Sequence, residues 1–288
     1  MSTEPSPARL LPAGVPPLFR GLVDDAAVFP PGNAPLPDAL AAHARHRAAW
    51  YADLVGPLLL PASALAGLKD TPLPAIGVVG DTGLAGLPAA LAGADGCWRQ
   101  VEVAVAKRGE DPQPGLGTLL ETVADGPPVD VFAEIPLTGG LLGALDTLAA
   151  ARDGGARVAP KFRTGGLAAE LFPTPVELAA VICACRERDL PFKLTAGLHH
   201  ALRHTEPETG FTHHGFLNVL AGVLAAGAGA EVAEVAELLG STDPVPLVEA
   251  VRANRDHQRP LWTGFGSCSI PEPLADLAAL GLIDGGTR

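Results

Sequence analysis

Short runs of β-branched and other apolar residues alternate along most of the chain with longer Ala- and Leu-rich amphipathic runs. Runs of the first kind are typical of buried strands, and runs of the second kind are typical of helices that cover a sheet. The predicted strands are Phe19–Asp24, Leu54–Leu60, Ala75–Val79, Gln100–Ala106, Val129–Ile135, Arg157–Phe162, Phe192–Ala196 and Leu261–Gly266. The predicted helices are Pro37–Trp50, Leu65–Lys69, Leu84–Ala92, Leu116–Ala124, Leu141–Arg152, Pro175–Arg188, Phe216–Ala226 and Pro273–Leu280. This alternation predicts parallel strands joined by helical crossovers.

Eight strand–helix units match a closed (β/α)8 barrel, the TIM barrel, in both number and chain length. A doubly wound open sheet is the alternative within the α/β class, because the same units could lie flat. No G-x-G-x-x-G loop follows the first predicted strand, and this favours the barrel. We therefore expect a single barrel domain at residues 18–288, with a helical insertion at about residues 231–254, preceded by a flexible N-terminal arm at residues 1–17.

Composition narrows the classes of partner. The chain has 288 residues, of which 48 % are hydrophobic, and this length can bury a core without disulfides or metal. Its 32 acidic and 20 basic residues give a net charge of −12, so we expect neither nucleic acid nor a membrane surface as a partner.

The apolar stretch from Gly215 to Ala230 is too short to cross a bilayer. The four cysteines form no C-x-x-C unit, and the chain starts without a signal-peptide pattern, so we expect a cytoplasmic protein. A homo-oligomer is compatible with the sequence.

Barrel enzymes carry their active sites at the carboxyl ends of the strands, so polar residues in or just after each strand are the candidates. In this chain they are Asp24, Asp25, Glu102, Glu134, Lys161, Arg163, Lys193, Thr195, Ser267, Cys268 and Ser269. The two lysines are notable because the chain has 16 arginines and only four lysines, and because both stand in apolar strands. Two ammonium groups in one apolar barrel mouth would be desolvated and would repel each other, which favours a neutral amine. A neutral lysine amine is the nucleophile that Schiff-base catalysis requires.

A structural interpretation stands beside the catalytic one. Lys161 and Lys193 could form buried ion pairs with Glu102 and Glu134 that only hold the barrel interior together. Spacing along the chain does not decide between a nucleophile and a structural ion pair. The Asp24-Asp25 pair likewise fits either substrate binding or a loop cap, and Arg163 fits either an anion or the neutralisation of Glu134.

Five short motifs resemble the deoxyribose-phosphate aldolase family of class I aldolases, and together they extend over about residues 98–280. The motifs are Lys161-Phe162-Arg163-Thr164-Gly165-Gly166, Phe192-Lys193-Leu194-Thr195-Ala196-Gly197, Val101-Glu102-Val103, Phe132-Ala133-Glu134-Ile135 and Gly264-Phe265-Gly266-Ser267-Cys268-Ser269. The resemblance implies that Lys161 forms the imine, that Lys193 lowers its pKa and that Glu102, where the family has aspartate, moves protons. It implies no cofactor and a small carbonyl substrate, with Gly266, Ser267 and Ser269 near the substrate.

The chain departs from the family pattern after the strand at Phe192–Ala196. The second glycine that the family has there is replaced, so that Gly197 is followed by Leu198, and phosphate recognition at this loop is in question. The Ser267-Cys268-Ser269 turn could bind an anion through its amides or could cap the last helix. The family's C-terminal tyrosine has no counterpart in this sequence.

A histidine-rich loop from His199 to His214 has no place in that pattern. It contains His199, His200, His204, His213 and His214. Imidazoles at a barrel mouth favour a metal-dependent enzyme as a second hypothesis, although no H-x-H or H-E-x-x-H motif is present. We assign no metal and take His199 and His200 as candidate substrate contacts, while His43 and His46 are expected on the solvated face of the first helix.

The leading expectation is a Schiff-base lyase of the aldolase type, which makes or cleaves a carbon–carbon bond in a sugar- or keto-acid-like substrate. A barrel that binds a small ligand without catalysis is the third hypothesis.

Overall fold

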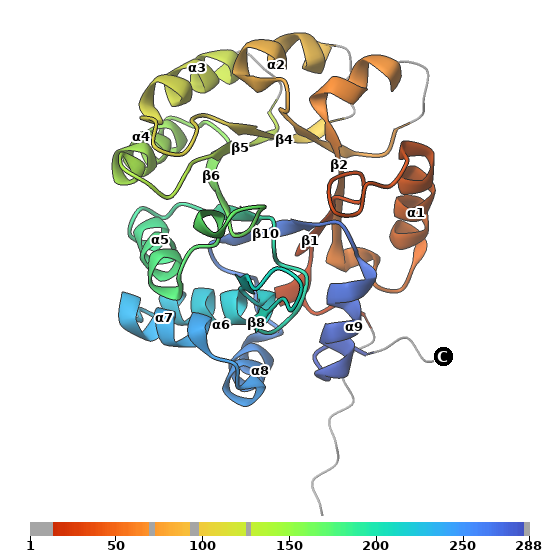
Figure 1. The fold of residues 1–288 in the computed structure, drawn as a ribbon, viewed down its shortest axis with the longest axis vertical. Coiled ribbons are helices and arrows are strands. Elements are labelled where there is room, and N and C mark those ends of the chain that lie inside the picture. Colours follow the sequence, from red (N-terminus) through yellow and green to blue (C-terminus); the bar gives the residue numbers. More distant parts are fainter. Residues whose placement is uncertain (1–13, 69–72, 93–97, 125–127, 285–288) are drawn as a thin grey trace, which may run out of the picture.

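The computed structural model describes residues 14–68, 73–92, 98–124 and 128–284. In these residues eight parallel strands form a closed barrel in the order β1-β10-β7-β6-β5-β4-β3-β2 (Figure 1). The strands are β1 Val23–Asp25, β2 Val55–Pro61, β3 Ile76–Val79, β4 Trp98–Ala104, β5 Asp130–Glu134, β6 Val158–Arg163, β7 Phe192–Thr195 and β10 Trp262–Ser267. Because β1 pairs with both β2 and β10, the sheet has no open edge, and the predicted TIM barrel is confirmed over the open sheet.

Helices form a ring outside the barrel, as Figure 1 shows. They are α1 Leu36–Ala48, α2 Gly83–Ala92, α3 Gln113–Ala124, α4 Leu141–Asp153, α5 Pro175–Glu187, α6 Phe216–Gly227 and α9 Pro271–Ala279. Two more, α7 Val232–Gly240 and α8 Pro244–Asn254, lie where the insertion was expected. Both pack against α6, which is therefore buried on nearly all sides and apolar all round. No described helix has both the length and the apolar character needed to cross a membrane.

Two predicted elements differ from the structure. The strand expected at Phe19–Asp24 is shortened to β1, and a 3-10 helix, η1 Pro17–Phe19, precedes it. Proline at the first position of η1 and Gly21 at a φ of 56° turn the chain before β1 begins. The helix expected at Leu65–Lys69 is the 3-10 helix η3 Ala62–Leu68, and Lys69 lies outside the described residues.

The N-terminal end of the described chain is part of the domain. Val15 is only 6 % exposed and belongs to the hydrophobic core, and Pro17 begins η1. The expectation of a flexible arm up to residue 17 is therefore wrong for these positions, while residues 1–13 lie outside the described part. Among the cysteines, Cys183, Cys185 and Cys268 are free thiols, and Cys97 lies outside the described residues.

Arg259, in the loop before β10, links β1 to β10 at the seam of the barrel, which is the place where the first and last strands pair. Its guanidinium donates hydrogen bonds to the carbonyl oxygens of Leu18 at 2.6 Å, Arg20 at 3.1 Å and Thr263 at 2.7 Å. Leu18 and Arg20 lead into β1, whereas Thr263 belongs to β10. One side chain thus donates hydrogen bonds both to the segment before β1 and to β10 itself.

Candidate active site

The two strand lysines meet inside the barrel. Lys161 on β6 and Lys193 on β7 are register partners, and their side chains are 4 % and 3 % exposed. Successive residues of a strand point to opposite faces, so both lysines share the inward face. The two lysines therefore lie next to each other inside the barrel.

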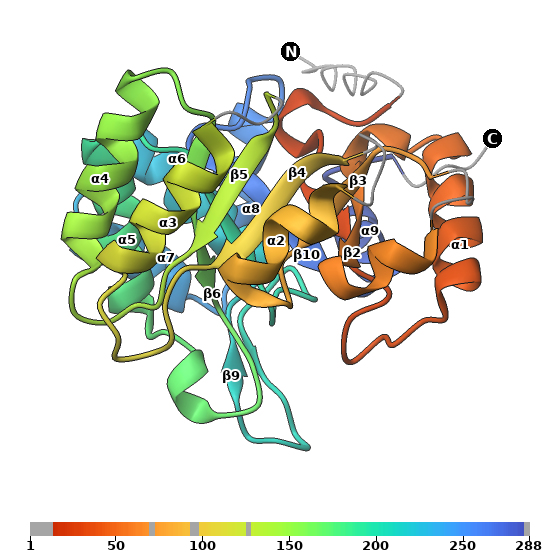
Figure 2. The same cartoon turned by 90° about the horizontal axis from the view of Figure 1, so that it is seen from above.

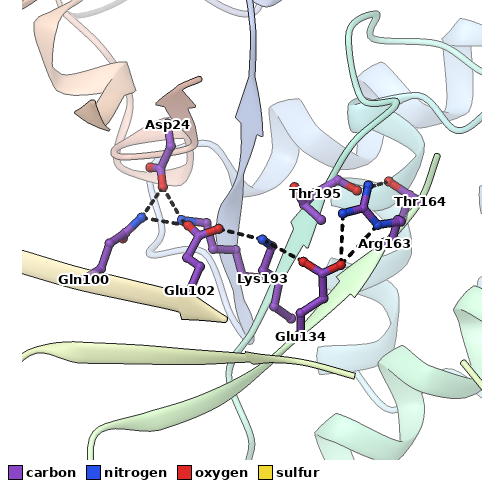
Figure 3. A network of polar contacts seen from close by, with 9 residues as sticks. Asp24, Gln100, Glu102, Glu134, Arg163, Thr164, Lys193 and Thr195 are labelled. Atoms are coloured by element: carbon purple, nitrogen blue, oxygen red, sulfur yellow. Dashed lines mark hydrogen bonds and ion pairs between the residues drawn. The ribbon is translucent and has the colours of Figure 1, made fainter. Parts of the chain in front are cut away.

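Three carboxylates surround the two ammonium groups (Figure 3). Lys161 Nζ lies 2.8 Å from Glu102 Oε2 and 3.0 Å from Glu134 Oε2. Lys193 Nζ lies 2.6 Å from Glu102 Oε1 and also forms an ion pair with Asp24. Lys193 additionally lies over the Phe132 ring, 4.9 Å from its centroid. Glu102 therefore bridges the two lysines with its two oxygens.

Sequence reasoning missed Gln100, which holds the other side of this network. Its Nε2 donates hydrogen bonds to Asp24 Oδ2 at 2.7 Å and to Glu102 Oε1 at 3.0 Å. Gln100 stands two residues before Glu102 on β4, so the period-two rule that selects Glu102 also selects this position. Gly56 on β2 leaves the room for Asp24, because a Cβ at position 56 would overlap Asp24 Oδ1.

The ionisation of the site differs from the expectation. Burial disfavours the charged ammonium of Lys161, but Glu102 and Glu134 outweigh burial and raise its pKa above 10.5. For Lys193, burial is likewise outweighed, by Asp24 and Glu102, and its pKa is also raised. The expected neutral amine is therefore corrected. Both lysines are ammonium ions at neutral pH in the free protein, because carboxylates and not a bare apolar wall surround them.

The carboxylates are not equivalent. Burial alone would raise the pKa of Glu102, but Lys161 and Lys193 outweigh it and lower the pKa to about 2. Burial raises the pKa of Asp24, and the charge of Glu102 adds to this rise although Lys193 opposes it. Two neighbouring acids are thus driven in opposite directions, which is common where a site must both hold a charge and exchange a proton.

Glu134 connects this network to a cavity at the barrel mouth. Its Oε1 accepts a hydrogen bond from Arg163 Nε at 3.1 Å, and Arg163 Nη2 lies 3.0 Å from the same oxygen. Burial would raise the pKa of Glu134, but Lys161 and Arg163 lower it. Glu134 and Arg163 line a cavity of about 290 Å³ formed by the segments that follow β4, β5 and β6. Glu134 thus contacts Lys161 and also lines the cavity at the mouth.

Asp25 lies away from this network. Its carboxylate is 2 % exposed and lies 3.0 Å from His43 Nδ1 of α1. Because Asp24 faces inward, its neighbour faces the outer layer of the barrel. Asp25 therefore belongs to the packing between β1 and α1 and not to the substrate-binding residues. His43 was expected on a solvated face of the first helix. It is only 2 % exposed, because it packs against the buried Asp25 carboxylate.

The remaining candidate residues, on β7 and in and after β10, are not members of the lysine–carboxylate network. Thr195 follows Lys193 on the inward face and pairs with Arg163 and Gly266. Ser267 Oγ donates to the Ser269 carbonyl at 2.8 Å, and Ser269 Oγ accepts from the amide of Glu272 at 3.3 Å. Both hydroxyl groups thus take part in the turn that starts α9, which agrees with the capping interpretation of this segment.

The histidines after β7 lie at the mouth but outside the lysine network. His199 Nδ1 lies 3.3 Å from Glu272 Oε2, and His200 Nδ1 lies 3.4 Å from Asp276 Oδ2, so both face α9. The loop itself forms a hairpin of β8 His204–Thr205 and β9 Thr212–His213, which extends from the barrel together with the segment after β6 (Figure 2). His204 and His213 stack across this hairpin at 5.2 Å.

His214 is fully buried beside the hairpin. Its Nε2 lies 2.7 Å from the carbonyl oxygen of Pro173, and burial lowers its pKa to about 4. Among the residues that the structure describes, no three His, Cys, Asp or Glu side chains are grouped so that they could hold a metal ion.

Comparison with models of known protein families finds no match for this chain, and comparison with curated proteins finds none either.

Proposed function

We propose that this protein is a lyase of the class I aldolase type, which forms a Schiff base between Lys161 and a small carbonyl compound. One observation carries the proposal. Two buried lysines on adjacent strands share the carboxylate of Glu102 inside the barrel, beside a cavity at its carboxyl end. An amine that attacks a carbonyl needs a base within reach and a second charge to set its pKa, and this arrangement supplies both.

Lys161 is the better nucleophile of the pair because it lies next to the cavity. Its partner Glu134 lines that cavity, whereas the partners of Lys193, Asp24 and Glu102, do not. A carbonyl compound in the cavity would reach Lys161 by displacing a single ion pair. Lys193 lies farther from the cavity and keeps its positive charge. Once Glu134 has been displaced, this charge opposes protonation of the Lys161 amine.

The raised pKa of Lys161 means that its ammonium group must lose a proton before it can react. This proton passes through Glu102 or Glu134 to solvent, and the free amine then attacks the carbonyl carbon to give a carbinolamine. A proton taken up from solvent through the same carboxylate converts the departing hydroxyl to water, so that water leaves and a protonated imine remains. Over these steps, an ammonium and a carbonyl give an iminium and one water.

The iminium then acts as the electron sink. The electron pair of the breaking carbon–carbon bond moves toward the iminium nitrogen and gives an enamine, while a carboxylate accepts the proton of the hydroxyl that becomes the second carbonyl. Glu134, which lines the cavity, and Glu102, which contacts Lys161, are the carboxylates placed to accept this proton. Protonation of the enamine and hydrolysis of the imine return the free Lys161. The reverse order of steps joins the two fragments.

One observation favours a second function. Each lysine has two carboxylate partners, and this complete pairing is also what a purely structural charge network would show. Such a barrel would bind a small molecule without forming a covalent bond. It predicts that substitution of either lysine lowers stability and changes no chemistry.

Reductive trapping separates the two functions. The protein is incubated with a panel of aldehydes, ketones and 2-keto acids and reduced with borohydride, and the modified peptide is located by mass spectrometry. The expected result is one adduct at Lys161 with at least one carbonyl compound. The proposal is wrong if no compound in the panel modifies Lys161.

Two controls make the result specific. Lys107 is exposed in the loop after β4 and lies outside the lysine network, so an adduct at Lys107 without one at Lys161 does not support the proposal. The variant Lys161→Arg keeps a positive charge beside Glu102 and Glu134 but has no amine that forms an imine. It should remain folded by circular dichroism and lose the adduct.

A further inference from the structure

The mouth cavity has a distinct chemical character that the lysine network does not use. It is formed by the loop after β4, the end of β5 and the segment between β6 and α5, and its volume is about 290 Å³. This is near the lower limit of small-molecule pockets, so it suits a compound of metabolite size and not a polymer. Leu137, Leu171 and Pro173 give it one apolar wall.

Three cations line the same cavity. Arg163 uses Nε and Nη2 on Glu134, and its side chain is 43 % exposed. A guanidinium has five N–H donors in a planar fork, so Arg163 retains donors for a ligand. Lys107 and Arg108 stand together in the loop after β4, and neither side chain forms an ion pair with any residue that the structure describes.

Two of the three acidic side chains in the lining already have ion-pair or hydrogen-bond partners. Glu134 contacts Lys161 through one oxygen and Arg163 through the other. Glu177 Oε2 accepts hydrogen bonds from the Thr174 amide and hydroxyl, which cap α5. Glu170 is the remaining acid of the lining. The lining therefore carries three acidic and three basic side chains, so it is far less acidic than the protein as a whole, whose charge is −12.

We propose that Lys107, Arg108 and Arg163 bind an anionic group of the substrate, a carboxylate or a phosphate, in this cavity. The inference rests on the proposed function, and it names the substrate class as a small carbonyl compound that carries a negative charge. Anchoring the anion on Arg163 would place the rest of the molecule toward Glu134 and Lys161. Planar, two-point contact with a carboxylate or phosphate is what a guanidinium provides.

This position differs from the one that the sequence motifs suggest. In the turn after β10, the amides of Ser269 and Glu272 already donate hydrogen bonds, to Ser267 Oγ at 3.2 Å and to Ser269 Oγ at 3.3 Å. The unpaired cations lie instead across the barrel mouth, above β4 to β6. Anion recognition is thus assigned to the opposite side of the site.

Direct binding tests this assignment without any covalent step. Isothermal titration calorimetry is carried out at low ionic strength with lactate, which carries a carboxylate but no carbonyl group that could form an imine, and with inorganic phosphate. We expect at least one of them to bind the wild-type protein, and the tighter of the two identifies the anion. Lys107→Gln and Arg108→Gln should each weaken its binding by about tenfold, as loss of one charge-assisted contact requires.

The control is Arg45→Gln, which removes the same charge from an exposed position of α1, away from the cavity lining. This variant should bind like the wild type, and all three should keep the wild-type melting temperature. The assignment is overturned if neither anion binds the wild type, or if the Lys107 and Arg108 variants bind as Arg45→Gln does.

The outcome is separable from that of the proposed function. Loss of anion binding in the Lys107 and Arg108 variants together with no adduct at Lys161 would leave an anion-binding barrel that is not an aldolase. An adduct at Lys161 whose formation is equally efficient with pyruvate and acetone, and unchanged in these variants, would leave an aldolase that does not select anions.

Discussion

Lys161 and Lys193 approach the same carboxylate from opposite sides, with Nζ atoms 2.8 Å from Oε2 and 2.6 Å from Oε1 of Glu102. The negative charge of Glu102 therefore offsets the repulsion between the two ammonium groups. Removing this one negative charge changes the ionisation of two amines at once, and this coupling is the basis of the predictions that follow.

Glu102→Gln should destabilise the protein strongly. The amide has nearly the same shape, but it leaves two buried ammonium groups with one carboxylate fewer, and breaking a buried ion pair costs about 3–5 kcal/mol. The free energy of unfolding measured in urea should fall by that amount. Glu121→Gln, at an exposed position of α3, is the control and should change it by less than about 0.5 kcal/mol. Equal, small effects for the two variants would contradict the ion-pair network.

Acid should weaken the wild-type protein through the same residue. The pKa of Glu102 is lowered from 4.5 to about 2, so its contribution is fully present above pH 4.5 and is lost as the pH falls through 2. This difference corresponds to about 3 kcal/mol. The stability gap between wild type and Glu102→Gln should therefore close as the pH is lowered from 5 toward 2, as followed by urea unfolding at each pH.

Adduct formation at Lys161 should accelerate with pH. Because the pKa of Lys161 is raised above 10.5, the neutral fraction is small at neutral pH and grows about tenfold per unit up to that pKa. The rate of borohydride trapping with a fixed carbonyl compound should rise between pH 7 and pH 9. The stabilising effect of the ammonium has the opposite trend, since it is present below 10.5 and is lost as the pH rises through the folded-state pKa. A rate that is flat from pH 6 to pH 9 would indicate a neutral amine and would contradict the assigned ionisation.

Gly56→Ala should displace Asp24 from the network. The added Cβ would overlap Asp24 Oδ1, so either the carboxylate or the strand must move, at a cost of about 1–3 kcal/mol. Gly117→Ala in α3 is the matched control, because a Cβ there meets nothing within 4 Å and alanine favours a helix by about 0.5–1 kcal/mol. Thermal unfolding should show a lower midpoint for the first variant and an equal or higher one for the second.

His43→Ala should lower stability without touching the lysine network. It leaves the Asp25 carboxylate buried without its imidazole partner, which costs about 3 kcal/mol. His46→Ala, on the same helix but only half-buried, should cost less than about 1 kcal/mol. Trapping at Lys161 should persist in both variants under conditions where they are folded. Loss of the adduct in His43→Ala would place Asp25 in the reaction after all.

Much of the site follows from the period of a strand. Alternation puts Lys161 and Arg163 on one face of β6 and Glu102 on the same face of β4, and barrel closure turns these faces toward one another. The same rule reaches Gln100, which was overlooked because a neutral amide carries no obvious chemistry. The bounds of strands and helices can also be predicted from the sequence wherever apolar runs are long.

Other features depend on distances that no local pattern encodes. The sign of the lysine pKa shifts depends on how many carboxylates reach each ammonium, and Asp24, far away in the sequence, contacts Lys193 only because the barrel closes. The face of α1 that carries His43 was misassigned because its burial depends on Asp25, a buried polar partner on β1. Apolar periodicity has no means to detect such a pair.

The seam at Arg259 also bears on how this protein assembles. The carbonyl groups that it joins are separated by more than two hundred residues of sequence, so the contacts between β1 and β10 form only after β10 has been synthesised. Until then β1 and β7 each expose an unpaired edge, and exposed edges recruit other chains. Loss of this one guanidinium would therefore show itself first as aggregation of newly made protein, before any change in the chemistry at the opposite end of the barrel.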